Sequence, residues 1–346
     1  MLARSQFLNH SSGKHIRTPL LVPSFSSRGF GYEEKESDNT GKPILISQAS
    51  EMLELTAPQL NDSLLLSAYD LHYQLLPNAI NHLSVPEIIF IDSGGYELGA
   101  SNDLSAVKDS MPGSKPWSSE LFQETLKSIP REPLNLIGIV NYDLDSKGHP
   151  LEEQIHSARR LFNDWPQFIH TFLLKPTTGS QQYLPMAQIK AAVPELRGFS
   201  IIGVTEDELG NSLLDRITNI ADLRKTLDAE GISTPIHVFG SLDPLLTPLY
   251  FLAGAEIFDG LSWLRYGYHE GIAIYYQHFS ALGPGIQRQR SKVRAQMLIN
   301  NLNELDRLRM NMTTFLDNEN FGVFGRFAKQ LEEWYKHLSG RLGGIR

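Results

Sequence analysis

The chain is organised as eight short apolar runs, rich in β-branched residues, that are separated by longer segments of helical period. This alternation is typical of βα units built around a parallel sheet. The runs are almost continuously apolar, as expected of strands buried on both faces. The expected strands span 19–23, 63–69, 88–92, 136–143, 170–175, 199–204, 236–240 and 256–261. Eight units predict a (β/α)₈ barrel, with an open doubly wound sheet as the alternative that periodicity alone does not separate.

The segments between the strands include three clear helical patterns, at 151–164, 212–230 and 245–253, the last preceded by a capping Asp243-Pro244 pair. Two stretches break the pattern. The polar, Gly-rich segment 26–43 is expected to be a mobile loop, and 99–117 a surface excursion. Beyond Gly283 the chain becomes helical and basic. We therefore expect a barrel domain at 1–282, with loop insertions, and a basic C-terminal helical extension at 283–346 packed on it.

Composition excludes several classes of site. The 346 residues are 41% hydrophobic, enough for one large barrel core, and contain no cysteine. Disulfides, Cys nucleophiles and Cys-based zinc sites are therefore excluded, and the eleven histidines show no metal-binding spacing. We expect no metal and no cofactor. The net charge of -8 argues against a surface that coats nucleic acid non-specifically. Without an apolar run of membrane-spanning length or a secretory signal, a cytoplasmic protein without membrane contact is expected.

Three of the expected strands finish on an aspartate: Asp92, Asp143 and Asp259. Barrel enzymes build their sites at the C-terminal ends of the strands, so three such carboxylates would meet at one mouth. A carboxylate at an apolar strand end is costly to bury unless it is paired or used. Each Asp taken alone is equally compatible with a cap on the following turn. Convergence of all three favours a functional site.

The residues after Asp92 add detail to this mouth. Ser93 is followed by Gly94 and Gly95, which let the backbone approach a ligand or adopt positive φ. Tyr96 then offers a flat face suited to stacking on a base. A tight βα turn with an ordinary core aromatic is the alternative interpretation.

With these motifs in order from about Thr18 to Gly271, the chain resembles the tRNA-guanine transglycosylase superfamily, whose members exchange guanine for 7-deazaguanines. The similarity is carried by short motifs, which are Thr18 to Pro23, Asp92 to Glu97 (with Glu97 in place of the usual Gln), Tyr142 to Leu144, Phe239-Gly240, Ile257 to Asp259, and Arg265.

This resemblance implies a role for each carboxylate. Asp259 would attack C1′ and form a covalent glycosyl-enzyme, and Asp92 would be the general acid and base for the departing and entering bases. Asp143 would accept hydrogen bonds from the Watson–Crick edge of a guanine-like base. The chemistry suits these residue types, because displacement at C1′ passes through an oxocarbenium-like state that a carboxylate stabilises. The second carboxyl handles the proton of the leaving base.

The resemblance also implies the walls of the base pocket. Tyr96 and Phe239 would sandwich the base once it has left its stack, and the backbone N–H of Gly203 would bind the base oxygen. The remaining implied pocket residues are Ser93, Gly94, Gly95, Gly240, Arg265 and Lys175. Lys175 or a close neighbour stands where the family has a base-binding Gln, so the family's base selectivity does not carry over to this chain. Ile202 stands where the family often has the first of two Gly residues, which narrows that wall.

The departures from the family bear on the polymer. Most members carry a zinc held by three Cys and one His, which helps to place tRNA, and this chain has no cysteine. Some relatives, the DpdA-type enzymes, insert 7-deazaguanines into DNA. DNA is therefore favoured over tRNA as partner. A basic stretch would contact the phosphates, namely Arg288, Arg290, Lys292 and Arg294. A solvated helix face is the alternative for that stretch, and a homodimer or an accessory protein is an expectation from resemblance only.

Two other functions remain open at this stage. The chain could be a non-catalytic, nucleic-acid-binding subunit of the same superfamily, although the presence of both Asp92 and Asp259 argues against it. It could also be an unrelated barrel glycosidase that uses two carboxylates across a sugar-sized cleft.

Overall fold

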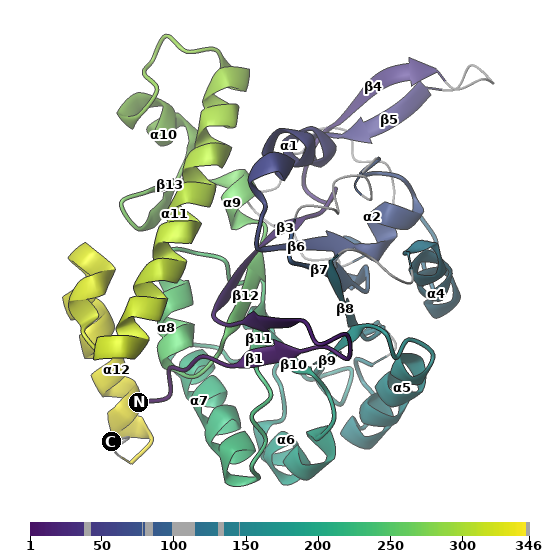
Figure 1. Cartoon of the computed structure of the whole chain (residues 1–346), viewed down its shortest axis with the longest axis vertical. Coiled ribbons are helices and arrows are strands. Elements are labelled where there is room, and N and C mark those ends of the chain that lie inside the picture. Colours follow the sequence, from purple (N-terminus) through teal and green to yellow (C-terminus); the bar gives the residue numbers. More distant parts are fainter. Residues whose placement is uncertain are drawn as a thin grey trace.

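A closed barrel of eight parallel strands forms the centre of the molecule (Figure 1). The computed structural model describes residues 1–37, 43–77, 79, 86–98, 115–130, 135–144 and 146–343. Around the barrel the strands are β3 (Leu20–Phe25), β6 (Ser63–Ser67), β7 (Ile88–Asp92), β8 (Leu136–Val140), β9 (Ile169–Leu173), β10 (Ile201–Thr205), β11 (Ile236–Phe239) and β12 (Ile257–Gly260). All eight expected strands are confirmed. Because β9 pairs with β10 and β12 with β3, the ring closes and the open-sheet alternative is wrong.

The barrel interior is filled by apolar side chains. Val22, Phe90, Leu173 and Ile257 belong to one buried cluster there. The Phe90 ring fits because the adjacent strand β8 places a glycine beside it: a Cβ on Gly138 would lie 2.7 Å from the Phe90 ring. A short hairpin of β1 (Phe7–Asn9) and β2 (His15–Arg17) contributes Leu8 and Ile16 to the same cluster. This hairpin therefore closes the N-terminal end of the barrel and leaves the opposite end for a site.

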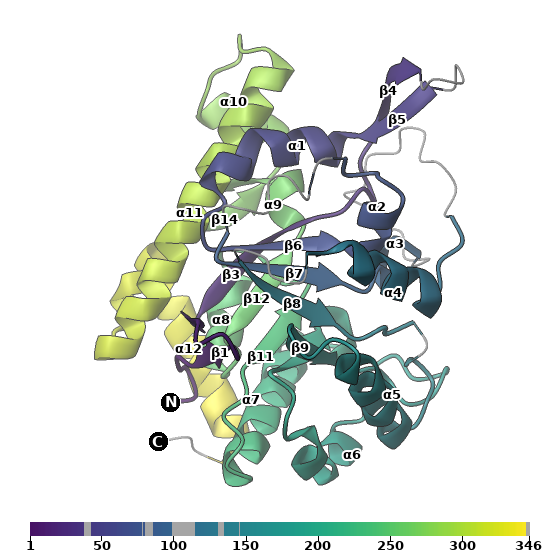
Figure 2. The same ribbon diagram turned by 45° about the vertical axis from the view of Figure 1, so that its right-hand side comes forward.

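Helices surround the barrel and separate the strands (Figures 1 and 2). They are α1 (Gln48–Thr56), α2 (Ala68–His72), α3 (Gly95–Leu98), α4 (Ser119–Ser128), α5 (Leu151–Asn163), α6 (Met186–Ala191), α7 (Leu213–Ala229) and α8 (Leu246–Leu252). The three expected helices are confirmed as α5, α7 and α8. Ser212 caps α7 by accepting from the Asp215 N–H, and Asp243 accepts from the first N–H groups before α8.

The expectation of a loop at 26–43 is wrong for most of its described part. Strand β4 (Tyr32–Ser37) pairs antiparallel with β5 (Pro43–Ser47), and the hairpin projects from the body of the molecule (Figure 1). The Gly and polar residues suggested a loop, whereas the run Pro43 to Ser47 supplies β-branched residues that pair with the preceding segment. The other segment expected to be irregular is 99–117. Residues 99–114 of it lie outside the described residues.

The C-terminal part is helical, as expected. After α9 (Ser262–Arg265) come β13 (Gly267–His269), β14 (Ile272–Ile274), α10 (Tyr276–Leu282), α11 (Arg290–Asn318), a 3₁₀ segment (Phe321–Phe327) and α12 (Ala328–Arg341). The long helix α11 is held to the segment α9–β13, which follows the last barrel strand, by the fully buried Asn301. Its side chain accepts from the Tyr268 N–H and donates to the carbonyls of Trp263 and Tyr266. Across the described part of the chain, none of the helices combines the length and the apolar character needed to cross a bilayer.

Candidate active site

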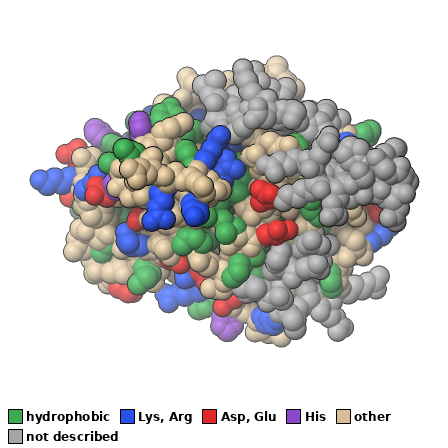
Figure 3. All heavy atoms as spheres, turned by 90° about the horizontal axis from the view of Figure 1, so that it is seen from above, with side chains coloured by type: hydrophobic (Ala, Val, Ile, Leu, Met, Phe, Trp, Pro, Cys, Tyr) green, Lys and Arg blue, Asp and Glu red, His purple; other side chains and the backbone are tan. Residues whose placement is uncertain are grey.

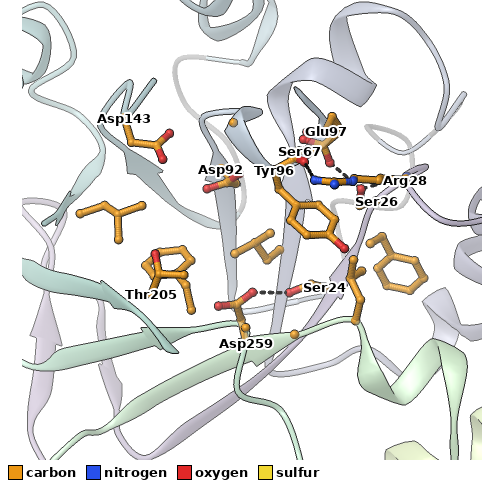
Figure 4. Close-up of a pocket in the computed structure, with 18 of the residues that line it drawn as sticks. Ser24, Ser26, Arg28, Ser67, Asp92, Tyr96, Glu97, Asp143, Thr205 and Asp259 are labelled. Atoms are coloured by element: carbon orange, nitrogen blue, oxygen red, sulfur yellow. Dashed lines mark hydrogen bonds between the residues drawn. The ribbon is translucent and has the colours of Figure 1, made fainter. Parts of the chain in front are cut away.

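A cavity of about 640 Å³ lies at the C-terminal ends of the barrel strands. The three strand-end aspartates, Asp92, Asp143 and Asp259, all line it (Figure 4). They come from β7, from the residues just after β8, and from β12. The convergence expected from the sequence is therefore present in the structure, because parallel strands all present their carboxyl ends to one mouth.

Asp259 is buried and receives a hydrogen bond on each carboxylate oxygen. The Ser24 hydroxyl donates to Oδ2 at 2.7 Å, and His237 Nε2 lies 3.1 Å from Oδ1. Ser24 belongs to β3 and His237 to β11, the two strands that flank β12. The carboxylate is thus held between two neighbouring strands, with a lone pair left on each oxygen for a reacting atom.

Asp143 is held by a hydroxyl and a cation. The buried Ser93 hydroxyl donates to Oδ1, and Lys175 Nζ lies 3.2 Å from Oδ2. The carboxylate fits against the backbone only because residue 95 is glycine: a Cβ there would lie 2.8 Å from Oδ1. Gly95 is therefore needed for close packing. Ser93 does not line the cavity, but its hydroxyl holds the carboxylate of Asp143.

Lys175 has three partners for its three N–H donors. Besides Asp143 it contacts Glu208 Oε2 at 3.3 Å and donates to Thr205 Oγ1 at 3.2 Å. Burial lowers the pKa of this ammonium, but Asp143 and Glu208 outweigh burial and the net effect is a raised pKa. Lys175 therefore stays charged, and in this structure it fixes Asp143 rather than pointing a spare donor into the cavity. Glu208 also pairs with Lys147 at 3.4 Å, on the cavity rim.

Asp92 is the carboxyl with the most strongly perturbed acidity. Burial raises its pKa well above the usual value, and the charges of Asp143, Glu97 and Asp259 raise it further. One weak hydrogen bond from the Gly94 N–H, at 3.3 Å, opposes this shift. Asp92 is therefore protonated over a pH range in which an ordinary carboxyl is charged, as a general acid requires.

Two further carboxyls have raised pKa values: Glu97, which also lines the cavity, and the fully buried Asp70. Glu97 accepts from the Ser26 hydroxyl at 2.5 Å, and burial together with the Asp70 charge raises its pKa to about 7. Asp70 accepts from the Ser27 hydroxyl and N–H at 2.5 and 2.6 Å, and burial raises its pKa to about 7. Two consecutive serines after β3 thus bind one acid each.

Tyr96 lies at the rim of the cavity, partly exposed, with Arg28 beside it (Figure 4). The Arg28 guanidinium lies 4.5 Å from the ring centroid and donates to the Tyr96 carbonyl. Arg265 donates to the Tyr96 hydroxyl at 3.1 Å and to the Arg28 carbonyl at 3.2 Å. Because the guanidinium of Arg28 already covers part of the ring, only the remaining surface of Tyr96 is available to a ligand.

Phe239 forms another wall of the cavity and packs against His237. Its ring stacks on His237, with centroids 3.8 Å apart. Gly203 makes room for it, since a Cβ on Gly203 would lie 2.8 Å from the Phe239 ring. Gly203 packs against Phe239 and is not among the residues that line the cavity. A contact between the Gly203 N–H and a base stays a prediction.

The expected site residues fall into three groups. Those lining the cavity are Asp92, Asp143, Asp259, Gly95, Tyr96, Lys175, Phe239, Gly240 and Arg265. Those behind its wall are Ser93, Gly94 and Gly203, of which Gly94 has φ +86° and packs against Trp117. The basic residues lie apart from it.

The basic stretch borders a separate hollow at the start of α11. Arg288 and Arg290 line it together with Tyr276, whose ring lies 5.9 Å from the Arg290 guanidinium carbon. Lys292 is exposed, and Arg294 donates to Gln48 on α1 at 3.4 Å. Seen from above, Lys and Arg side chains gather beside a small group of Asp and Glu side chains near the middle of the face (Figure 3).

Sequence reasoning missed several cavity residues and their supports. They are Ser24, Arg28, Lys147, Thr205, Glu208 and the buried His237. A signal existed for two of them. His237 is two residues before Phe239 on one strand and therefore shares its face, and Ser24 is two residues after Val22.

No family model matches the chain, and no curated protein matches it. Within the described ranges, no group of three or more His, Asp or Glu side chains is placed to share a metal ion.

Proposed function

We propose that this chain is a transglycosylase that exchanges guanine in nucleic acid for a 7-deazaguanine through a covalent glycosyl-aspartate. The observation that carries the proposal is the meeting of Asp92, Asp143 and Asp259 in one cavity that is also lined by Tyr96 and Phe239. The three carboxyls differ in their surroundings, and pairs of acids with different environments are how a site divides acid, base and nucleophile roles.

The first half of the reaction would remove guanine. An Asp259 oxygen attacks C1′ of the nucleotide, and the C1′–N9 bond breaks with its electron pair passing to the base. Asp92, protonated because burial and its acidic neighbours raise its pKa, gives its proton to a ring nitrogen of the leaving guanine. The products are neutral guanine, a sugar bound to Asp259 and an Asp92 carboxylate.

The second half would reverse these steps with a different base. The Asp92 carboxylate takes the N9 proton of the entering 7-deazaguanine, and N9 attacks C1′ as the bond to Asp259 breaks. Asp92 is then protonated again and Asp259 is free, so the cycle balances without a cofactor. The hydrogen bonds from Ser24 and His237 support Asp259 as leaving group in this half.

Recognition of the base would depend on Asp143. A guanine-like base presents N–H donors on its Watson–Crick edge, and a carboxylate is an acceptor with two lone pairs on each oxygen. Ser93 and Lys175 use one position on each oxygen and leave the others for the base. Because Ser93 and Lys175 both donate to this carboxylate, its remaining lone pairs face the cavity as acceptors for the N–H groups of the base.

We favour DNA over tRNA as the polymer, because the chain lacks the cysteines of the zinc subdomain that helps related enzymes to place tRNA. Arg28 and Arg265 at the cavity rim, and Arg288 and Arg290 at the start of α11, supply positive charge for phosphates. Tyr275, which is 66% exposed, adds an aromatic surface near the second pair.

The test is incorporation of labelled base. The purified chain is incubated with radiolabelled guanine or 7-cyano-7-deazaguanine, and single-stranded DNA, duplex DNA and tRNA are offered separately. We expect label in DNA from the wild type and none from Asp259→Asn, which keeps the shape of the nucleophile but removes its charge. A denaturation-resistant protein–DNA complex should form with the wild type when free base is withheld.

Each alternative gives a different result in the same assay. Binding of nucleic acid without incorporation would support a non-catalytic subunit, and hydrolysis of simple glycosides without incorporation would support a two-carboxylate glycosidase. Incorporation that survives Asp259→Asn would remove the nucleophile role from this residue.

A further inference from the structure

A buried histidine connects the carboxylate of Asp259 to the aromatic wall of the cavity. The His237 side chain is completely inaccessible to solvent. Its Nε2 lies 3.1 Å from Asp259 Oδ1, and its ring stacks on Phe239 at a centroid distance of 3.8 Å and an interplanar angle of 24°. The Phe90 ring also lies near it, with centroids 5.6 Å apart and an interplanar angle of 59°. One ring therefore touches both residues that the proposed reaction assigns to the sugar and to the base.

The tautomer of His237 follows from its partners. A carboxylate only accepts, so Nε2 must carry the hydrogen in this contact. Nδ1 is buried and has no hydrogen-bond partner among the described residues, which suits a bare lone pair better than a buried N–H. The environment therefore supports a single arrangement, in which His237 donates to Asp259.

Asp259 needs such a donor because its last side-chain torsion has only a weak preference of its own. The last side-chain torsion of an aspartate is broad and roughly two-fold, so packing alone does not fix the plane of the carboxylate. Ser24 holds Oδ2 from one flanking strand and His237 holds Oδ1 from the other. With both donors in place the plane is set. With Ser24 alone, the carboxylate can turn about that single contact.

We infer that His237 is a positioning residue for Asp259, and that its stacking on Phe239 couples the seating of a base to the orientation of the carboxylate. The inference rests on the proposed function. A base that presses on Phe239 would also bear on the histidine ring, because Gly203 beneath Phe239 leaves no side chain to take up the contact. Correct seating of the base would thereby favour the carboxylate orientation that attacks C1′.

The test compares two variants with one control. His237→Leu removes the donor, whereas His237→Gln can place an amide N–H near Oδ1. Thr171→Val is the matched control, because Thr171 is also fully buried, also has an unpartnered polar atom and makes no contact with Asp259 in the described structure. We expect His237→Leu to lower kcat for base exchange about 10- to 100-fold, the range for one hydrogen bond to a charged group. KM for the polymer should stay within about threefold, and His237→Gln should recover at least part of kcat.

A second readout does not depend on activity. Long-range ¹H–¹⁵N spectra of the full chain labelled in histidine should show His237 as the Nε2–H tautomer, and Asp259→Asn should shift its signals. An Nδ1–H tautomer would overturn the inference, as would an unchanged kcat in His237→Leu or equal losses in the Leu and Gln variants. If the wild type exchanges no base at all, the proposed function fails, while the spectra still decide whether His237 donates to Asp259.

Discussion

The substitution Glu97→Gln tests how much a buried, charged carboxylate in the acid-rich site lowers the free energy of unfolding. The Glu97 carboxyl is buried between Ser26 and Ser67, and burial and Asp70 raise its pKa from 4.5 to about 7. In the substitution Glu97→Gln, the amide oxygen can still accept from the Ser26 hydroxyl, and the amide nitrogen can donate to Ser67, whose hydroxyl has no other partner in the described structure. The change therefore removes a titrating group with little change of shape.

The sign of the effect follows from the direction of the shift. A carboxyl whose native pKa is raised binds its proton more tightly in the folded than in the unfolded state. The free energy of unfolding of the protein therefore falls as the pH rises from 4.5 to about 7. Each pKa unit corresponds to about 1.36 kcal/mol, which makes the charged Glu97 unfavourable by about 3 kcal/mol above pH 7. Glu97→Gln should be more stable than the wild type by up to about 3 kcal/mol at pH 8, and equal to it near pH 4.5.

The measurement is urea unfolding of both proteins at several pH values between 4.5 and 8. Glu333→Gln, which alters an exposed carboxyl on α12, is the matched control and should follow the wild type. The variant should keep part of the pH dependence, because Asp70 and Glu256 also have pKa values raised to about 7. A stability difference of the same size at every pH would refute the reasoning, since a packing effect does not titrate.

Two further predictions concern the cations. Lys175→Met leaves the buried Asp143 without its cation and Glu208 with Lys147 alone, and should cost about 3–5 kcal/mol in urea unfolding, whereas Lys147→Met, at the exposed end of the same network, should cost less than about 1 kcal/mol. Arg288→Ala and Arg290→Ala should each weaken DNA binding for all sequences and lower the slope of log K against log salt by about 1 in fluorescence anisotropy. Arg197→Ala, which lies before β10 at the opposite end of the barrel, should leave that slope unchanged.

The barrel could be predicted from the sequence because each strand is a dense apolar run flanked by segments of another period. The hairpin β4–β5 could not. Its first strand is written Tyr-Glu-Glu-Lys-Glu-Ser, without the apolar pattern that marks a buried strand, and it is formed by pairing with the run that starts at Pro43. Two-stranded ribbons of this kind depend on their partner, so composition in a single window does not reveal them.

The candidate site was predictable to the extent that its residues end strands. Asp92, Asp143 and Asp259 each follow an apolar run, and strand ends converge by topology. Their partners were not predictable. Lys175 was expected to touch a base, whereas the structure shows its donors committed to three neighbours, which only coordinates reveal. His237 sits inside an apolar run, where a single histidine is most simply read as a core residue.

The distribution of charge in the cavity bears on how a polyanion could enter it at all. Two like charges 4 Å apart repel by about 4 kcal/mol at an effective dielectric constant of 20, so three free carboxylates would oppose a phosphate-linked substrate.

The chain reduces this repulsion in two ways. A raised pKa keeps Asp92 neutral, and Lys175 compensates Asp143. Of these three carboxyls, Asp259 is then the one that neither a raised pKa nor a lysine offsets, and it is the one the proposed chemistry needs. Arg28 and Arg265 at the rim would attract the phosphates of the proposed substrate. In the proposed reaction, the raised pKa of Asp92 would serve substrate entry as well as proton transfer, because the proton that later passes to the base first lowers the negative charge of the cavity.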